Sequence, residues 1–344
     1  MKKLSSELST GSESQKQVAA HHPQPVQAGY VALAGRPNVG KSTLLNQCLG
    51  SEISIVTPKA QTTREKVFGI YTNVEATRQI VFVDTPGLHK AREGGINAFM
   101  VGEAREALET ADLIWYLVDP ASHLEHEQLV VEHLKRQRVP VFVIFNKADL
   151  KHLSSQAEYW QKELLALLEK EGVLVQKVFH TSALRKKGVD ELLAATWEFI
   201  PEAAALFYED TEQLSDRPVR YFVAEKIREQ LFLQLGDELP YSCAVEVQSF
   251  KDPNETSKIT RIEAMIHVER ESQKGMVIGQ KGQKIKEIGQ RARLQIEEFL
   301  ERPVFLGLKV ECLKDWTRDP KRLEQLGYLL PGTPRSPKSP KNKR

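Results

Sequence analysis

The stretch Gly35-Arg36-Pro37-Asn38-Val39-Gly40-Lys41-Ser42 matches the pattern G-x-x-x-x-G-K-[ST] at every fixed position. The apolar run before it, Tyr30–Ala34, predicts a buried strand, and the run after it, Thr43–Leu49, predicts a helix. In this strand–loop–helix context, backbone amides cradle phosphate groups. Lys41 can reach the β- and γ-phosphates, and the Ser42 hydroxyl can ligate Mg²⁺. The stretch therefore predicts a nucleoside triphosphate site.

Short apolar runs alternate with helical segments from Tyr30 to about Ile200. The predicted strands are Tyr30–Ala34, Lys66–Thr72, Gln79–Val83, Leu113–Val118, Val139–Phe145 and Gln176–His180, and the intervening helices include Gln156–Glu171 and Val189–Phe199. Alternation of this kind indicates an α/β domain with helices on both faces of a mixed, mostly parallel sheet.

The composition is that of a globular protein of about two domains, with 344 residues, 41% hydrophobic residues and a net charge of +2. No apolar run approaches the roughly 18 residues that span a bilayer. The first 28 residues lack the apolar segment of a secretory signal, and the three scattered cysteines suit a reducing cytosol. We therefore expect a cytoplasmic protein.

Changes in composition along the chain divide it into segments. We expect a disordered tail over residues 1–28, the phosphate-binding domain over 29–201, a linker over 202–218, a second domain over 219–328 and a disordered basic tail over 329–344. The basic tail is able to contact RNA or membrane phosphates, or simply to keep the chain in solution.

Two further elements complete a nucleotide site. Asp84-Thr85-Pro86-Gly87 follows a predicted strand, so Asp84 can hold Mg²⁺ through its water shell and the Gly87 amide can sense the γ-phosphate. Asn146-Lys147-Ala148-Asp149 follows another strand, and the Asp149 carboxylate offers two acceptors to the N1–H and 2-amino donors of guanine. Adenine has no such donor pair, so the predicted ligand is GTP.

The remaining nucleotide contacts are predicted from their positions along the chain. The amides of Ser182 and Ala183, which follow the sixth strand, can donate to guanine O6. Between the phosphate loop and Asp84, a threonine hydroxyl can complete the Mg²⁺ shell only when GTP is bound, which makes its segment a switch. We favour Thr63 over Thr62 because it directly precedes Arg64. The metal ligands are then Ser42, Thr63 and Asp84.

These motifs resemble the translation-factor-related GTPases, particularly the TrmE-Era-EngA-like family with its T-T-R switch and D-T-P-G. Where Ras-like enzymes carry a water-orienting glutamine, this chain has Leu88, which cannot orient water, so we expect slow hydrolysis. Asn38 matches an asparagine that related GTPases use to hold K⁺ beside the phosphates. The resemblance implies that Lys41, Thr63, Gly87 and Asn38 act in catalysis.

The second domain carries a different signature. The predicted order is helix, strand, strand, helix, G-x-x-G loop, helix, strand, with the loop at Gly279–Gly282 and basic residues clustered around it. This order resembles an α+β type II KH domain, which clamps about four single-stranded nucleotides. The predicted RNA-binding residues are Gly279, Gln280, Lys281, Gly282, Lys284, Lys286 and Arg291.

A GTPase domain followed by a type II KH domain resembles the Era family over about residues 29–328. The resemblance implies a monomeric, GTP-controlled factor that binds 16S rRNA near its 3′ end during maturation of the 30S subunit. It also implies cytoplasmic localisation with peripheral association with the cell membrane. The alternative is a GTPase of an RNA-modification or other RNA-processing complex, although Cys312 lies within a predicted strand rather than in the C-terminal motif of those relatives.

Overall fold

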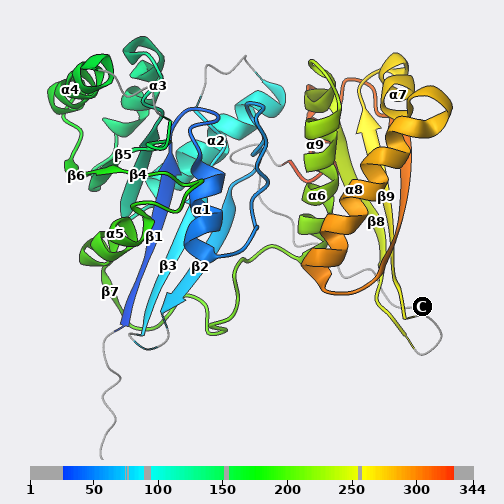
Figure 1. Ribbon diagram of the computed structural model, residues 1–344, viewed down its shortest axis with the longest axis horizontal. Helices are drawn as coiled ribbons and strands as arrows, with labels where there is room; N and C mark the ends of the chain where they lie inside the picture. Colours follow the sequence, from blue (N-terminus) through cyan, green and yellow to red (C-terminus); the bar gives the residue numbers. More distant parts are fainter. Residues whose placement is uncertain are drawn as a thin grey trace, which may run out of the picture.

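The computed structural model describes residues 26–73, 75, 77–88, 94–150, 155–254 and 258–328. They form two domains that lie side by side, each built on its own sheet (Figure 1). The predicted basic tail, residues 329–344, and residues 1–25 of the predicted N-terminal tail lie outside the described residues. Within the described ranges, none of the helices combines the length and the hydrophobicity needed to cross a bilayer.

The N-terminal domain contains a seven-stranded sheet in the order β2-β3-β1-β4-β5-β6, with a short β7 paired to β1. The strands are β1 (Val26–Ala34), β2 (Val67–Asn73), β3 (Arg78–Asp84), β4 (Leu113–Val118), β5 (Val141–Phe145), β6 (Val175–His180) and β7 (Glu202–Ala203). Neighbours from β3 to β6 run parallel, whereas β2 and β7 run antiparallel to their partners. The predicted mixed, mostly parallel sheet is confirmed.

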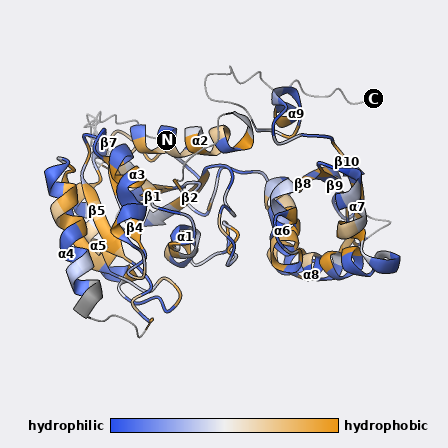
Figure 2. Ribbon diagram, turned by 90° about the horizontal axis from the view of Figure 1, so that it is seen from above, coloured by the Kyte–Doolittle hydropathy of each residue, from blue (hydrophilic) through white to orange (hydrophobic). Residues whose placement is uncertain are grey.

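Helices cover both faces of this sheet. They are α1 (Lys41–Leu49), α2 (Gly95–Glu109), α3 (Leu124–Leu134), α4 (Ser155–Lys170) and α5 (Val189–Thr196), which continues into the single turn η1 (Trp197–Phe199). Val31 and Leu33 of β1 pack with α1 and α5, while the alternate residues Ala32 and Ala34 pack with α2, α3 and α4. Because both faces are buried, the inner strand β5 is apolar throughout (Figure 2).

The first strand begins earlier than predicted. β1 starts at Val26, because Val26 and Gln27 pair with β7, so the predicted disordered tail extends three residues too far. The predicted linker is also fixed to the sheet. The Ile70 amide donates to the Leu214 carbonyl at 2.9 Å, and the Ser215 hydroxyl donates to the Phe68 carbonyl at 2.6 Å. These bonds cover part of the edge strand β2.

The C-terminal domain has a three-stranded sheet in the order β10-β9-β8, with β9 and β10 parallel and β8 antiparallel to β9. Its elements are α6 (Val219–Gln234), η2 (Leu239–Ser242), β8 (Ala244–Lys251), β9 (Thr260–Val268), α7 (Glu271–Ile278), η3 (Gln280–Gly282), α8 (Gln283–Leu300), β10 (Val304–Cys312) and α9 (Pro320–Gln325). The helices α6, α7 and α8 share one core with the sheet. The predicted order of elements is confirmed, and α9 is an addition that the sequence did not predict.

Candidate nucleotide and nucleic-acid sites

The phosphate loop joins β1 to α1, and Lys41 is the first residue of α1. Its ammonium group donates to the carbonyls of Gly35 at 3.2 Å and Arg36 at 2.9 Å. Burial lowers the pKa of Lys41 to about 8, although the nearby charge of Asp84 acts in the opposite direction. An anionic phosphate in the loop would add negative charge beside this buried ammonium and stabilise its protonated form.

Three oxygen-bearing side chains from separate segments converge beside Lys41. The Ser42 hydroxyl donates to Asp84 Oδ2 at 2.6 Å and lies 3.1 Å from Thr63 Oγ1. The Thr62 hydroxyl is instead bonded to Thr57 Oγ1 at 2.7 Å, which favours Thr63 as the metal-binding threonine. Burial raises the pKa of Asp84, so this carboxyl has a cost of ionisation that a cation would offset. Hydroxyl and carboxylate oxygens in this arrangement fit Mg²⁺.

The D-x-x-G segment packs directly against the phosphate loop. A Cβ on Gly87 would lie 2.4 Å from the Pro37 nitrogen, so only glycine allows this approach. The Leu88 amide donates to the Gly35 carbonyl at 3.1 Å, but the Leu88 side chain is buried in the core. Position 88 therefore places no polar side chain near the phosphates.

Three other predicted site residues also have side chains that face the protein interior. The Thr85 hydroxyl donates to the Leu33 carbonyl at 2.7 Å, and the Val39 side chain belongs to the core between the sheet and α1. Pro86 is buried beside Thr85. Only the backbone of these residues is available to a nucleotide.

Asn146 connects three loops at the other end of the site. Its amide nitrogen donates to the Val39 carbonyl at 2.8 Å in the phosphate loop. Its oxygen accepts from the Thr181 hydroxyl at 3.1 Å and from the Ala183 amide at 2.9 Å. The Ala148 amide in turn donates to the Thr181 carbonyl. Asn146 thus holds the predicted base-binding loops against the phosphate loop. The two amides that we predicted as donors to guanine O6 are both bonded within the protein in this structure, that of Ala183 to Asn146 and that of Ser182 to the Lys187 carbonyl at 3.0 Å.

Asp149 is held by the third of these loops. The Ser182 hydroxyl donates to its carboxylate at 2.5 Å, and this bond lowers the pKa of Asp149. The carboxylate is therefore ionised at neutral pH, as recognition of two guanine donors requires. Lys147 lines the site, and its ammonium pairs with Asp119 at 2.7 Å, which restricts the orientation of the side chain.

The structure adds residues that sequence reasoning missed. A cavity of about 430 Å³ lies between the phosphate loop and the predicted switch segment. Besides predicted residues, its lining includes Ile55, Val56, Thr57, Pro58 and Gln61. The Asn38 amide nitrogen donates to the Pro58 carbonyl at 2.8 Å across this cavity. The segment has no periodicity, so only the predicted switch role could have pointed to it.

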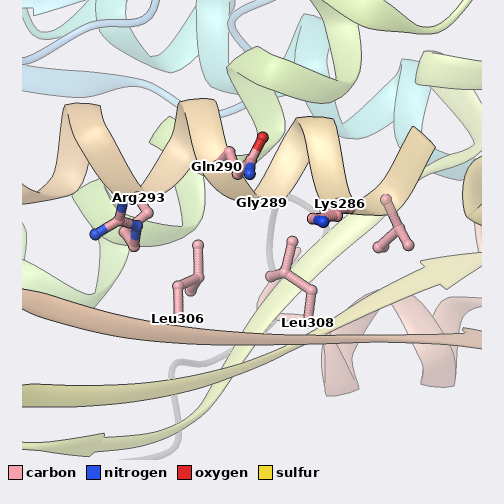
Figure 3. A pocket seen from close by; sticks show the side chains of 7 residues that line it. Lys286, Gly289, Gln290, Arg293, Leu306 and Leu308 are labelled. Atoms are coloured by element: carbon pink, nitrogen blue, oxygen red, sulfur yellow. The ribbon is translucent and has the colours of Figure 1, made fainter. Parts of the chain in front are cut away.

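A second cavity lies in the C-terminal domain, between α8 and β10. It has a volume of about 310 Å³, and Figure 3 shows side chains of α8 above it and Leu306 and Leu308 of β10 below it. Its polar lining consists of Lys286, Gln290 and Arg293. A groove with cations on one wall and apolar side chains on the other suits phosphates and unstacked bases.

The predicted RNA-binding residues are placed unevenly around this groove. Lys286 lines it, while the G-x-x-G loop lies at the N-terminal end of α8. Gly279 has φ +72° and a Cβ there would lie 2.5 Å from Lys284 Cβ, so the turn requires glycine. Gln280 and Lys281 are exposed, whereas Gly282 is half-buried. Arg291 is exposed elsewhere on α8. Sequence reasoning missed Gln290, Leu306 and Leu308, which lie on the groove only after the helix packs on the strand.

Comparisons with known proteins match both domains. The family model described as a 50S ribosome-binding GTPase matches residues 30–147, and the KH domain model matches residues 238–317. GTPase Era of Geobacter metallireducens is 42% identical over 305 residues, covering 88% of this chain and 98% of that protein. GTPase Era of Coxiella burnetii is 41% identical over 308 residues, covering 89% of this chain and 99% of that protein.

Two solved structures cover the same extent. One is an Aquifex aeolicus Era variant bound to GDP and AlF4⁻, and the other is Era in complex with MgGDPNP and nucleotides 1506–1542 of 16S ribosomal RNA. Each has a TM-score of 0.81 and 36% sequence identity, and covers 89% of this chain and 100% of the solved chain.

Proposed function

This chain belongs to the Era family of GTPases, and from that premise we propose that it binds 16S rRNA near its 3′ end and acts in assembly of the 30S ribosomal subunit. The observation that carries the proposal is the pairing of two sites in one chain. Ser42, Thr63 and Asp84 converge beside the phosphate loop, and a groove on α8 joins basic to apolar side chains. A relative that is 36% identical in sequence has been solved with both MgGDPNP and a segment of 16S rRNA, which supports both sites.

In the nucleotide site, we assign tasks to Asp149, to Lys41 and to the three metal ligands. The ionised Asp149 carboxylate accepts the N1–H and 2-amino donors of guanine, and Lys41 neutralises the phosphates. Mg²⁺, held by Ser42, Thr63 and Asp84, would neutralise charge that develops on the transferred phosphoryl group. Leu88 is buried in the core, so its side chain orients no water. We therefore expect slow intrinsic turnover that suits a switch.

Potassium is part of the proposal. The Asn38 amide nitrogen donates to the Pro58 carbonyl, so the side-chain amide has a defined orientation at the rim of the phosphate cavity. Since the nitrogen is engaged, the oxygen is the atom available to a cation. A K⁺ ion held there would add positive charge near the phosphates, as an arginine does in other GTPases.

In the groove of the C-terminal domain, the two walls have different tasks. Lys286 and Arg293 would neutralise RNA phosphates, and Leu306 and Leu308 would contact unstacked bases. The G-x-x-G loop at the end of α8 allows the RNA backbone to approach closely.

We further propose that the protein acts as a cytoplasmic monomer on the 30S subunit. The three cysteines are free, and Cys48 and Cys243 are buried, as suits a reducing compartment. Peripheral membrane association remains a prediction from the resemblance, and the basic tail that would contact lipid phosphates lies outside the described residues.

Binding of labelled RNA to the full chain tests the proposal. The RNA would span the segment equivalent to nucleotides 1506–1542 of 16S rRNA, and a scrambled RNA of the same length serves as the control. We expect specific binding that is tightest with GDPNP, by about tenfold over GDP. Equal affinity for the scrambled RNA would contradict 16S recognition. Equal affinity with GDPNP, GDP and no nucleotide would contradict control by the nucleotide.

A further inference from the structure

Arg64 belongs to the predicted switch segment of the N-terminal domain, but its side chain extends into the C-terminal domain and is buried there. Its guanidinium donates to the Cys243 carbonyl at 2.8 Å, the Tyr241 carbonyl at 2.9 Å and the Pro240 carbonyl at 3.4 Å. These carbonyls belong to η2 and the residue before β8. The planar fork of an arginine matches such a set of acceptors, whereas a lysine ammonium does not.

Aromatic rings complete the pocket around this guanidinium. Its Cζ lies 5.5 Å from the ring centroid of Trp316 and 6.0 Å from that of Phe232. The Trp316 indole donates to the Ser242 carbonyl at 2.8 Å, which fixes the ring. Only 5% of Arg64 is exposed, so its bonds are shielded from water. The pocket therefore encloses this side chain with carbonyl acceptors and aromatic rings.

The residue before Arg64 is the predicted magnesium ligand. Thr63 Oγ1 lies 3.1 Å from Ser42 Oγ in the N-terminal domain, while the next side chain is anchored in the other domain. Adjacent Cα atoms are about 3.8 Å apart, so an anchor at Arg64 restricts where the Thr63 hydroxyl can be. The two domains therefore hold the switch segment from opposite sides at this point.

Two contacts between α6 and residues 52–56, which precede the predicted switch segment, are more exposed than that of Arg64. Lys226 pairs with Glu52 at 2.8 Å, but 76% of the Glu52 side chain is exposed, and exposed ion pairs contribute little. The Val56 amide donates to Glu229 at 3.3 Å. The Arg64 side chain is more completely buried than those of Glu52 and Val56. It also directly follows Thr63, so its contacts restrict the metal-binding threonine most.

We propose that Arg64 is a positioning residue: by anchoring in the pocket formed by η2, Phe232 and Trp316, it holds Thr63 at the magnesium site, so that the C-terminal domain itself completes the GTP-specific state. This inference rests on the proposed function in one respect, which is that Thr63 ligates Mg²⁺ when GTP is bound. It predicts a selective effect on GTP, because the threonine contact is absent when GDP is bound.

The test compares affinities of fluorescent GDPNP and GDP for the full chain in the presence of Mg²⁺. We expect Arg64→Ala to weaken GDPNP binding about tenfold and to change GDP binding less than about twofold. Arg64→Lys should have an intermediate effect, because it keeps the charge but not the fork. Glu52→Gln, which removes a contact between α6 and the chain just before the predicted switch segment, is the control and should leave both affinities unchanged.

A double-mutant cycle separates positioning from a general structural role. If Arg64 acts through Thr63, then Arg64→Ala should add less than about twofold to the loss caused by Thr63→Ala. Additive losses, or equal weakening of GDPNP and GDP, would overturn the inference. If Arg64→Ala fails to fold, the same comparison with Arg64→Lys decides it. If the single variant Thr63→Ala binds GDPNP as tightly as the wild-type chain, that result would instead contradict the magnesium site of the proposed function.

Discussion

At the scale of single residues, Lys41 shows how the fold prepares a ligand site. The ammonium is buried and bonded to loop carbonyls, and this environment holds its pKa at about 8, below the usual value for lysine. A phosphate bound in the loop would stabilise the charged form and raise that pKa again. Nucleotide binding and protonation of Lys41 are therefore linked.

This linkage gives a pH dependence with a defined sign. Below about pH 8, Lys41 is already protonated in the free protein, so the affinity for GDP should be flat. Above about pH 8, binding must be accompanied by proton uptake, so affinity should fall by up to about tenfold per pH unit. Calorimetry near pH 8 in two buffers of different ionisation enthalpy measures the proton uptake. Flat affinity with no proton uptake would show that Lys41 stays charged in the free protein.

Asn38 makes the proposed potassium effect testable. We expect GTP turnover in KCl to exceed turnover in NaCl by about 10- to 100-fold, because a cation held by Asn38 would stabilise charge that develops during hydrolysis. In Asn38→Ala the two salts should give equal rates, whereas GDP affinity should be retained. Equal wild-type rates in both salts would remove K⁺ from the proposed mechanism.

At the scale of elements, the packing of α8 on β10 creates a groove that neither element has alone. The helix contributes Lys286 and Arg293, and the strand contributes Leu306 and Leu308 (Figure 3). Gly289 faces Leu308, and a Cβ there would lie 3.4 Å from Leu308 Cδ1. The absence of a side chain at this position keeps the groove open where helix and strand come close.

The groove predicts a change in salt dependence when its cations are removed. The double variant Lys286→Gln, Arg293→Gln should weaken RNA binding and reduce the slope of log affinity against log salt by about 1.4, as expected for two contacts with single-stranded phosphates. Lys309→Gln is the matched control, because Lys309 is exposed on β10 and does not line the groove. An unchanged slope in the double variant would place the phosphate contacts elsewhere.

At the scale of the whole molecule, the two domains share an interface rich in polar and charged contacts. Besides Arg64, the Lys59 ammonium donates to the Leu235 carbonyl at the end of α6. Near the other end of α6, Arg217 of the linker pairs with Glu65 at 3.2 Å. Polar interfaces of this kind are typical of domains that change their relative position. The segment that contains Thr63 is thus joined to the C-terminal domain by polar contacts.

Coupling between the two sites must be reciprocal. If GDPNP in place of GDP strengthens RNA binding by about tenfold, RNA must raise the preference for GDPNP over GDP by the same factor. Measuring both factors on the full chain checks this prediction, and Arg64→Ala should reduce both toward one. Retention of the full coupling in Arg64→Ala would show that the domains communicate by another route.

The sequence by itself determined the parts whose chemistry is local. The phosphate loop, the D-x-x-G segment and Asn146–Asp149 each consist of consecutive residues after a strand, so their backbone geometry and side-chain types were evident without the fold. The same is true of the G-x-x-G loop and the order of elements in the second domain. Neither β7 nor α9 had a comparable signal, because β7 has two residues and α9 has six.

Only the tertiary structure decided which distant residues meet. The pocket of Arg64 combines carbonyls of η2 with Phe232 and Trp316, and the groove combines α8 with β10. In the sequence, Arg64 was simply the residue that followed Thr63, and Leu308 was one of the apolar residues on a strand face. Contacts across long separations depend on how complete elements pack, and no local spacing encodes them. The ligands could therefore be predicted from motifs, whereas the connection between their sites could not.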